Sequence, residues 1–445
     1  MITKTNSIHC FLFAGLLILQ SCKLENTHSS GFNPPNIILI MADDLGYEGL
    51  SCYGNKVLHT PNIDRMAEGG LRFTDFHSNS SVCTPTRAAL LTGSYQQRVG
   101  LEGVIYVKGP TRQVGLDTSE ITIAKLLKSN GYATGLFGKW HLGYEPEYNP
   151  VYHGFDEFYG YVSGNIDYHS HYDNAGIYDW WHNLDSIKEE GYVTDLITDH
   201  TIDFIKEHKE VPFFAYVPYE SPHVPFQGPD DPAYRFDDNE FTYYGPVEDR
   251  DRAYIDMVES MDDGVGKILK TLTDLNLDEN TLVLFISDNG AESFGHNGIL
   301  KGNKISLHEG GHRVPAIAYW KGKIEQGITN ELAMTFDWMP TILSLTQIKN
   351  IATLQLDGLD LSQLLLTGQA LPERNLFWKY LKEKTIRQNE YKLLISESDT
   401  MLFNLENDIT ESDNIIALHP ERVKTMSAAL EQWEQEMNTV TQKTK

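Results

Sequence analysis

Four short apolar runs of this 445-residue chain each end in side chains that could carry chemistry. The residues that follow them are carboxylates, an amide, a lysine and two histidines: Asp43, Asp44, Lys139, His141, His223, Asp288 and Asn289. The runs themselves are typical of buried strands. Because ligands bind at the carboxyl ends of strands in open α/β sheets, we expect these side chains to meet at one sheet edge.

The acidic and amide members of this group offer only oxygen ligands: Asp43, Asp44, Asp288 and Asn289. Such ligands suit Ca²⁺ or Mg²⁺ better than Zn²⁺. Neighbouring carboxylates at a buried strand end repel each other, and a divalent cation relieves that repulsion. The alternative is turn chemistry, since Asp-Asp and Asp-Asn-Gly are good turn formers. The presence of both pairs at strand ends favours the metal site.

Cys83 stands just before a predicted short helix. Thr84 is expected to cap that helix, Pro85 to occupy its first position and Gly93 to end it. The amides at a helix start favour an anion, and Arg87 lies one turn in, close enough to reach the same spot. The alternative is a buried, inert cysteine.

These side chains must be positioned by an α/β fold. Short apolar runs predict strands at 36–41, 132–137, 213–217, 282–286 and 314–319. Helical periodicity lies between them, at 123–127 and 254–272. Strands that alternate with helices imply a large, parallel or mixed sheet sandwiched by helices.

The pattern changes after about residue 370. Short alternating pieces and one long helical pattern predict three strands and a terminal helix, at 384–387, 391–395, 401–404 and about 420–437. We therefore expect a main domain at 34–369 and a C-terminal subdomain at 370–445, the latter built from a small antiparallel sheet plus one helix.

The first segment predicts export. Lys4 precedes an apolar stretch at 8–19, which is too short to span a bilayer and suits the core of a signal peptide. The sequence Leu-Gln-Ser-Cys that ends at Cys22 resembles the lipobox of bacterial lipoproteins. We expect a signal peptide at 1–22, lipidation of Cys22 and a polar tether at 23–33. The expected location is the periplasm, or the outer membrane through this lipid anchor; the alternative is plain secretion.

Composition excludes several classes of protein. Hydrophobic residues make up 41% of the chain, which is ample for a core and excludes a disordered acidic protein. The formal net charge of −26 excludes nucleic acid as the main partner, because phosphate binding requires a basic surface. Four cysteines are too few for a disulfide scaffold in a chain of this length.

The stretch Cys83-Thr84-Pro85-Thr86-Arg87 resembles the signature of formylglycine-dependent sulfatases, whose common form is Cys-X-Pro-Ser-Arg. Thr86 stands in the serine slot and keeps a hydroxyl. Further segments of the family are similar to 36–46, 138–143, 287–290, Lys304 with 309–315, 391–394 and 402–405. The combination is specific, although each piece alone is not.

The resemblance implies an alkaline-phosphatase-like fold and a protein-derived nucleophile. A maturation enzyme would oxidise Cys83 to formylglycine, which hydrates to a gem-diol. The implied metal is Ca²⁺, with Mg²⁺ as the alternative. Its ligands would be Asp43, Asp44, Asp288, Asn289 and the hydrated group at Cys83.

The resemblance also implies how sulfate esters are hydrolysed. One gem-diol hydroxyl attacks sulfur, and the other makes the later expulsion of sulfate possible. Arg87, Lys139 and Lys304 bind sulfate oxygens and stabilise the transition state. His223, alone or with Lys304, protonates the departing oxygen. His141 holds the gem-diol and then helps to expel sulfate.

Substrate contacts are expected from the segment 161–182, which is dense in Tyr, Trp and His. Aromatic faces stack on sugar rings, so His169, His171 and Trp181 are candidate sugar contacts; the alternative is a packed loop that only completes the wall. An exported bacterial sulfatase would act on a sulfated small molecule or oligosaccharide, derived from glycosaminoglycan or algal polysaccharide. In so acidic a chain, a narrow cationic pocket for one sulfate is favoured over a broad basic groove.

Two other functions stay open at this point. One is hydrolysis of phosphoesters or phosphonate monoesters on the same scaffold, which turnover of aryl phosphate would reveal. The other is a non-catalytic, glycan-binding surface lipoprotein with a relic site. The full set of charged residues at strand ends argues against this second alternative.

One further motif, His308-Glu309-Gly310-Gly311-His312, matches the zinc pattern H-E-x-x-H. That pattern binds zinc only on a helix, where the two histidines share a face. The two glycines and the nearby Pro315 disfavour a helix. We therefore expect a Gly-rich loop that orders the active-site wall.

Overall fold

The computed structural model describes residues 1, 32–237, 242–245, 248–292, 294–349 and 354–441. The expected signal segment, Cys22 and most of the expected tether lie outside these residues. The chain from Pro34 onward forms one compact unit, separate from residues 1–33. Among the described residues, no helix combines the length and the apolar composition needed to cross a membrane.

The central element is a mixed ten-stranded sheet in the order β11-β2-β10-β9-β1-β8-β4-β5-β6-β7. Its strands are β1 (Asn36–Ala42), β2 (Leu71–Phe73), β4 (Ala133–Lys139), β5 (Glu157–Tyr161), β6 (Trp181–His182), β7 (Asp185–Ser186), β8 (Phe213–Pro218), β9 (Thr281–Ser287), β10 (Ala316–Tyr319) and β11 (Gly327–Thr329). β3 (Phe76–His77) and β12 (Ala333–Met334) form a separate parallel pair. All five strands predicted from apolar runs are present, and β1 lies between two parallel neighbours, β8 and β9.

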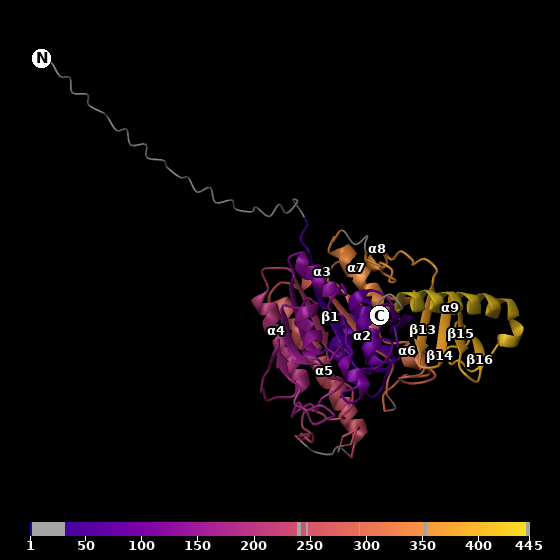
Figure 1. Cartoon of the computed structure of the whole chain (residues 1–445), viewed down its shortest axis with the longest axis horizontal. Coiled ribbons are helices and arrows are strands. Elements are labelled where there is room, and N and C mark those ends of the chain that lie inside the picture. The colour runs from indigo at the N-terminus through magenta and orange to yellow at the C-terminus, as the bar shows by residue number, and fades with distance from the viewer. Residues whose placement is uncertain (2–31, 238–241, 246–247, 293, 350–353, 442–445) are drawn as a thin grey trace. The chain divides into compact units, whose positions relative to one another are not determined.

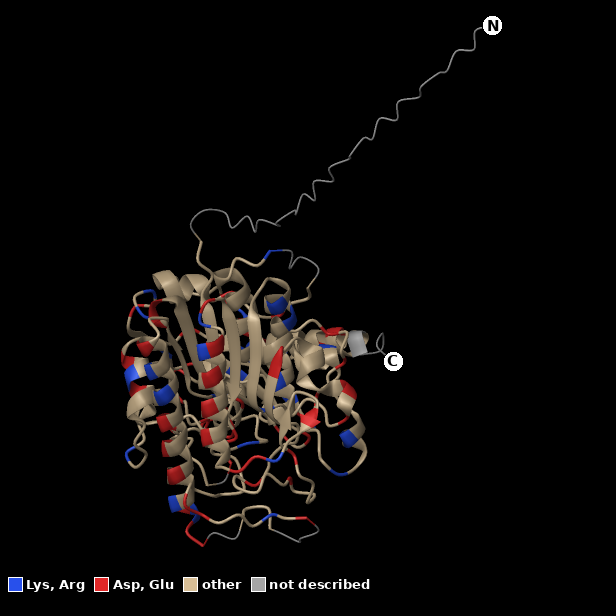
Figure 2. Ribbon diagram, turned by 90° about the vertical axis from the view of Figure 1, so that its left-hand side faces the viewer, with Lys and Arg blue, Asp and Glu red and all other residues tan. Residues whose placement is uncertain are grey.

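Helices cover both faces of the large sheet (Figure 1). One face packs against α1 (Pro61–Glu68), α4 (Val193–Glu207) and α5 (Arg250–Asp274). The other packs against α2 (Cys83–Thr92), α3 (Ile123–Ser129), α7 (Trp338–Leu345) and α8 (Ser362–Thr367). Alternate residues of β1 join the two cores, which is why this strand is a continuous apolar run. Figure 2 shows the consequence: the strands are mainly uncharged, and Lys, Arg, Asp and Glu lie mostly on helices and loops.

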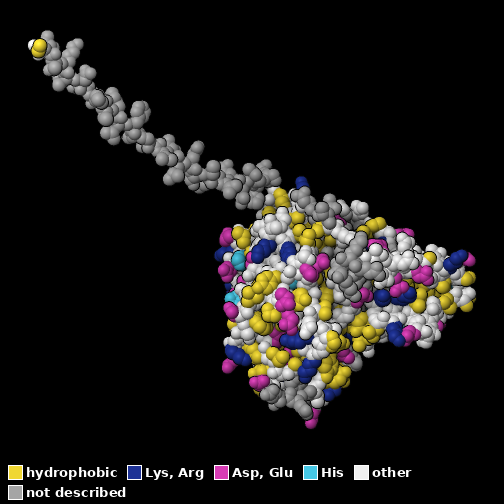
Figure 3. Space-filling view, in the orientation of Figure 1, with side chains coloured by type: hydrophobic (Ala, Val, Ile, Leu, Met, Phe, Trp, Pro, Cys, Tyr) yellow, Lys and Arg dark blue, Asp and Glu magenta, His cyan; other side chains and the backbone are white. Residues whose placement is uncertain are grey.

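The C-terminal part is an antiparallel sheet with one helix, as predicted, but it has a fourth strand, β13, that was not predicted. Its strands are β13 (Asn375–Tyr380), β14 (Glu383–Gln388), β15 (Tyr391–Ile395) and β16 (Thr400–Asn404), paired in that order. α9 (Pro420–Thr441) packs on this sheet through Met426, Leu430 and Trp433 (Figure 1). On the face shown in Figure 3, acidic and basic side chains are interspersed.

The expected Gly-rich loop is instead one helical turn, α6 (Glu309–His312). The turn is buried and packed too tightly for side chains at its glycines. A Cβ on Gly310 would lie 2.1 Å from the carbonyl oxygen of Gly302. The Gly290 N–H donates to the carbonyl of Gly311 at 2.9 Å. The turn therefore supports the loop that follows β9, and close packing, rather than loop geometry, accounts for the glycines.

A buried ion cluster joins this turn to the C-terminal sheet. The Lys392 ammonium lies 2.9 Å from Glu309 Oε1 and 3.0 Å from Glu411 Oε1. It also donates to His312 Nε2 at 3.2 Å, and His312 Nδ1 lies 3.0 Å from His77 Nδ1. Burial alone would raise the pKa of Glu309, but Lys392 and the neighbouring bases hold it well below its ordinary value. His77, Glu309 and His312 lie close enough together to hold a metal ion, but the Lys392 ammonium already supplies a cation there.

Replacing Lys392 with Met should destabilise the fold, because two buried carboxylates would lose a shared cation. The expected loss in the free energy of unfolding is about 3–5 kcal/mol, measured by guanidinium unfolding. The control is Lys382→Met, which removes an exposed pair with Glu397 whose side chains are 71% and 66% exposed. The control should change stability little. Equal losses in the two variants would contradict the role given to the buried cluster.

Candidate active site

The two acidic segments meet because β1 and β9 are parallel neighbours in register. Ala42 lies opposite Ser287, so the residues that follow each strand emerge side by side. Asp43, Asp44 and Asp288 are at most 1% exposed. Asn289 Nδ2 donates to Asp44 Oδ1 at 2.7 Å. The predicted meeting of these four side chains at one sheet edge is therefore present in the fold.

Three cations lie between these carboxylates. Arg87 donates to Asp288 Oδ2 through Nε at 3.1 Å and Nη2 at 2.7 Å. Lys139, the last residue of β4, donates to Asp43 Oδ2 at 2.5 Å. Lys304 donates to Asp44 Oδ2 at 2.7 Å. Each carboxylate thus has at least one cationic partner, and Arg87 Nη2 also lies 3.6 Å from Asp43 Oδ1.

The donor set fits a divalent metal ion. Asn289 Oδ1 is buried and has no hydrogen-bond partner. Burial and the repulsion from Asp288 raise the pKa of Asp43 to about 7. A cation bound among these oxygens would satisfy the amide oxygen and relieve the repulsion. The carboxylate and amide oxygens suit Ca²⁺ or Mg²⁺. A sulfur and a nitrogen also lie at the site, since ligand atoms of Cys83 and His223 lie within 4.8 Å of those of Asp43 and Asp44.

Cys83 begins α2, so the helix begins two residues earlier than predicted. Val82, in extended conformation, is the N-cap. Thr84 and Pro85 therefore occupy the second and third helical positions, not the cap and the first position. Gly93 ends the helix with φ 66°, as predicted. Cys83 thus lies in the first turn, where backbone amides lack helical partners and favour negative charge.

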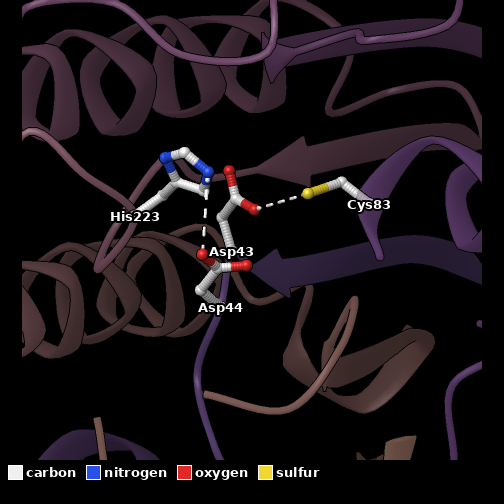
Figure 4. Close-up of side chains that lie close together, drawn as sticks. All are labelled: Asp43, Asp44, Cys83 and His223. Atoms are coloured by element: carbon white, nitrogen blue, oxygen red, sulfur yellow. Dashed lines mark hydrogen bonds and ion pairs between the residues drawn. The ribbon is translucent and has the colours of Figure 1, made fainter. Parts of the chain in front are cut away.

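The Cys83 thiol faces the acidic cluster. Sγ lies 3.6 Å from Asp43 Oδ1, as Figure 4 shows, and the residue is 2% exposed. Burial raises the pKa of this thiol to about 12. Because the thiolate is the reactive form of cysteine, an unmodified Cys83 is a poor nucleophile at neutral pH.

Two histidines complete the site. His223 Nε2 lies 3.6 Å from Asp44 Oδ2 (Figure 4), and its Nδ1 donates to the carbonyl of Val224 at 2.7 Å. Burial, with the nearby Lys304 and Lys139, lowers its pKa well below the ordinary value. His141 Nε2 lies 2.9 Å from the carbonyl of Ile105, and its Nδ1 is buried without a partner. Burial and Lys139 also lower the pKa of His141.

Four residues of the site, Cys83, His141, His223 and Lys304, line a pocket of about 150 Å³. The segment 161–182, expected to supply substrate contacts, does reach the pocket, but through Asn165 and Asn174. The sequence did not indicate the rest of the polar and aromatic lining: Tyr106, Tyr144, Tyr243, Glu292 and Tyr380. The sequence could have indicated Glu292, because it follows Asp288 and Asn289 by only a few residues. Tyr380 ends β13, so the C-terminal sheet contributes to the wall, and no local sequence signal indicates this.

The predicted sugar contacts lie elsewhere, and for these residues the packed-loop alternative describes the structure better. His171 is fully buried, and its Nε2 lies 3.0 Å from the carbonyl of Gly191. His169 Nε2 lies 3.1 Å from the carbonyl of Gly228. Trp181 lies in β6 and donates its indole N–H to Asp179 at 2.6 Å. None of the three lines the pocket.

Comparison with known proteins agrees with this arrangement. A family model described as Sulfatase matches residues 35–348. The chain belongs to the sulfatase family. Bovine (Bos taurus) arylsulfatase A is 38% identical to this sulfatase over 384 residues, which cover 78% of this chain and 70% of the relative. Pig (Sus scrofa) N-acetylgalactosamine-6-sulfatase is 35% identical over 394 residues, which cover 82% and 71%.

A solved structure extends the likeness to the whole fold. The crystal structure of Ps i-CgsB in complex with k-i-k-neocarrahexaose superposes with a TM-score of 0.82 at 32% identity, covering 90% of this sulfatase and 93% of that chain. The fold is therefore alkaline-phosphatase-like, as expected. Family and relatives together make this sulfatase a sulfuric ester hydrolase.

Metal binding should stabilise this sulfatase. A ligand that binds only the folded chain stabilises it by about 2.7 kcal/mol at a hundredfold excess over Kd. We expect Ca²⁺ added to chelated protein to raise the Tm, measured by calorimetry, and Asn289→Ala to reduce that rise by removing an oxygen ligand. The exposed Asn407 supplies the control variant Asn407→Ala, which should respond like the unaltered chain. A rise that Asn289→Ala leaves intact would place the ion elsewhere.

Proposed function

We propose that this sulfuric ester hydrolase removes sulfate from a sulfated carbohydrate, using formylglycine derived from Cys83 and Ca²⁺ held by the adjacent acidic cluster. The observation that supports this most strongly is the setting of Cys83. It begins a helix, faces carboxylates and cations, and is held as an unreactive thiol whose pKa is raised to about 12. A chemically inert side chain at the centre of such a site is best accounted for by a modification that makes it reactive.

Formylglycine supplies, once hydrated, a hydroxyl nucleophile and a second hydroxyl that permits turnover. Three features of the chain surround residue 83. The first turn of α2 presents backbone amides to it, Asp43 lies 3.6 Å from the sulfur, and Arg87 follows one turn later. His141 Nδ1, buried without a partner, is available to accept a proton from a hydroxyl there.

Charge balance argues that the sulfate site depends on a divalent cation. Without one, Arg87, Lys139 and Lys304 are all paired with carboxylates, and the cluster offers little uncompensated positive charge to an anionic ester. A bound Ca²⁺ or Mg²⁺ would supply that charge and polarise the sulfate oxygens. Asp43, Asp44, Asp288 and Asn289 would hold it. The same cations then stabilise charge that develops on the transferring group.

The leaving oxygen needs a proton, and two groups lie near Asp44 to provide it. Burial alone would lower the pKa of Lys304, but Asp44 outweighs it and raises that pKa well above the ordinary value. Lys304 therefore stays protonated and donates to the leaving oxygen. His223 has a lowered pKa and serves as an acid only in the fraction of molecules that carry the extra proton.

The carbohydrate assignment rests on the pocket and on named relatives. One relative is an N-acetylgalactosamine-6-sulfatase, and one similar structure holds k-i-k-neocarrahexaose. In this chain, tyrosines line the pocket above the cations, and aromatic rings suit the apolar faces of sugars. We also propose export, on the apolar stretch 8–19 and Cys22, and a maturation enzyme that converts Cys83.

Mass spectrometry of the peptide that contains residue 83 tests the nucleophile. Protein made with its maturation enzyme should show a mass loss of about 18 Da relative to cysteine. Cys83→Ala should lower kcat/KM for an aryl sulfate by roughly 10³-fold or more. Cys52→Ala, the matched control at the other described cysteine, should retain activity. Full activity with unmodified Cys83 would overturn the proposal.

A second measurement separates sulfate from phosphate chemistry. Both named relatives in the comparison are sulfatases, which favours the sulfate ester over the phosphate ester. We expect kcat/KM for an aryl sulfate to exceed that for the matching aryl phosphate by at least about tenfold. A clear preference for phosphate would instead support a phosphoester hydrolase on the same scaffold.

A further inference from the structure

The short segment from Lys304 to Leu307 joins the active site to the C-terminal core. The Lys304 ammonium donates to Asp44 Oδ2 at 2.7 Å, whereas Leu307 is fully buried in the core that contains the C-terminal sheet. Between them, Ile305 has a φ of 82°, which lies in the left-handed region. That region crowds every side chain with a Cβ, and β-branched residues adopt it least readily. The backbone at Ile305 is therefore strained.

Two hydrogen bonds hold Ile305 in this conformation. Its N–H donates to the carbonyl of Ser81 at 2.8 Å, and Ser81 Oγ donates to the carbonyl of Ile305 at 2.9 Å. Ser81 precedes Cys83 by two residues, so the strained residue is tied to the segment that carries the proposed nucleophile. Strained residues persist where the surrounding contacts over-determine them, and they are concentrated at functional sites.

The Ile305 side chain is more exposed than its type would favour. It is 53% exposed and lines the same pocket as Cys83, Lys304 and Tyr106. A glycine or an asparagine would adopt the same φ at a lower cost. Isoleucine at this position is thus unfavourable for the free chain in two ways, through its backbone and through its exposed apolar surface. A substrate that covers this surface would recover the second cost.

We propose that Ile305 packs against an apolar face of the ring from which sulfate is removed, and that the strained backbone is retained for this contact. The inference rests on the proposed sulfatase function and names a residue that recognises its leaving group. Lys304 is expected to protonate the leaving oxygen, so the ring bonded to that oxygen lies close to the next residue of the chain. Sugar and aryl rings both present apolar surface that an isoleucine can cover.

Kinetics with 4-nitrophenyl sulfate, together with inhibition by inorganic sulfate, test this contact. Inorganic sulfate has no ring and reports only on the cluster of carboxylates and cations. Ile305→Ala and Ile305→Gly should each raise KM for the aryl sulfate roughly five- to tenfold with little change in kcat. The inhibition constant of inorganic sulfate should stay within about twofold. Ile305→Leu keeps the apolar surface and should retain most of the affinity.

Ile328→Ala is the matched control, because Ile328 is 64% exposed on β11 and does not line the pocket. It should leave KM unchanged. A KM that neither small Ile305 variant alters would overturn the proposed contact. An equal rise in the inhibition constant of inorganic sulfate would show that Ile305 acts only by placing Lys304, and would also overturn it.

The two small variants also test the strain. Ile305→Gly should have a Tm about 1–2 °C above that of Ile305→Ala, because glycine adopts this φ freely and alanine does not. Equal Tm values would overturn the claim that the backbone is strained for this contact. Absence of aryl sulfate turnover by the unaltered, formylglycine-bearing enzyme would overturn the proposed function, and the contact with it.

Discussion

The structure depends on one electrostatic constraint: three carboxylates buried at adjacent strand ends must be neutralised where water cannot do it. Asp43, Asp44 and Asp288 repel one another, and the raised pKa of Asp43 records that cost. Arg87, Lys139 and Lys304 each pair with one of them. These cations come from α2, from the end of β4 and from the loop that precedes α6. The constraint therefore fixes the relative positions of three distant segments around Cys83.

A second buried charge cluster links this centre to the C-terminal sheet. Lys392 binds Glu309 and Glu411, and the turn that contains Glu309 lies against Gly290. The C-terminal sheet thus contributes in two ways. It supports the loop after β9 from behind, and it supplies Tyr380 to the pocket wall. Buried charged contacts therefore connect the segment that follows β9 with the C-terminal sheet that lines the pocket.

The elements that could be predicted from the sequence are those whose signals lie in a short stretch of the chain. A buried strand needs a continuous apolar run, so β1, β4, β8 and β9 and the polar residues after them were recognisable. The start of α2 was misplaced by two residues, because Thr84 and Pro85 have strong cap and first-turn preferences and tertiary contacts override them. The turn α6 was expected as a loop because helix propensity says nothing of the backbone contacts that require Gly310.

The residues that line the pocket could not be predicted from short stretches of sequence. Aromatic residues are common both in cores and at sugar sites, so density of Tyr, Trp and His at 161–182 could not distinguish the two. His171 proved to be core, whereas Tyr106, Tyr243 and Tyr380 reach the pocket from segments that come together only in the folded chain. Glu292 had a local signal, because it follows Asn289 by only a few residues.

Because the cations of the site are already paired with carboxylates, sulfate binding should depend on a divalent cation. Isothermal titration of inorganic sulfate into the enzyme, once loaded with Ca²⁺ and once stripped by chelation, measures this dependence. We expect Ca²⁺ to strengthen sulfate binding by at least about tenfold, because it adds positive charge that the carboxylates do not fully offset. Equal affinity in the two states would show that Arg87, Lys139 and Lys304 suffice, and that sulfate binding does not depend on the ion.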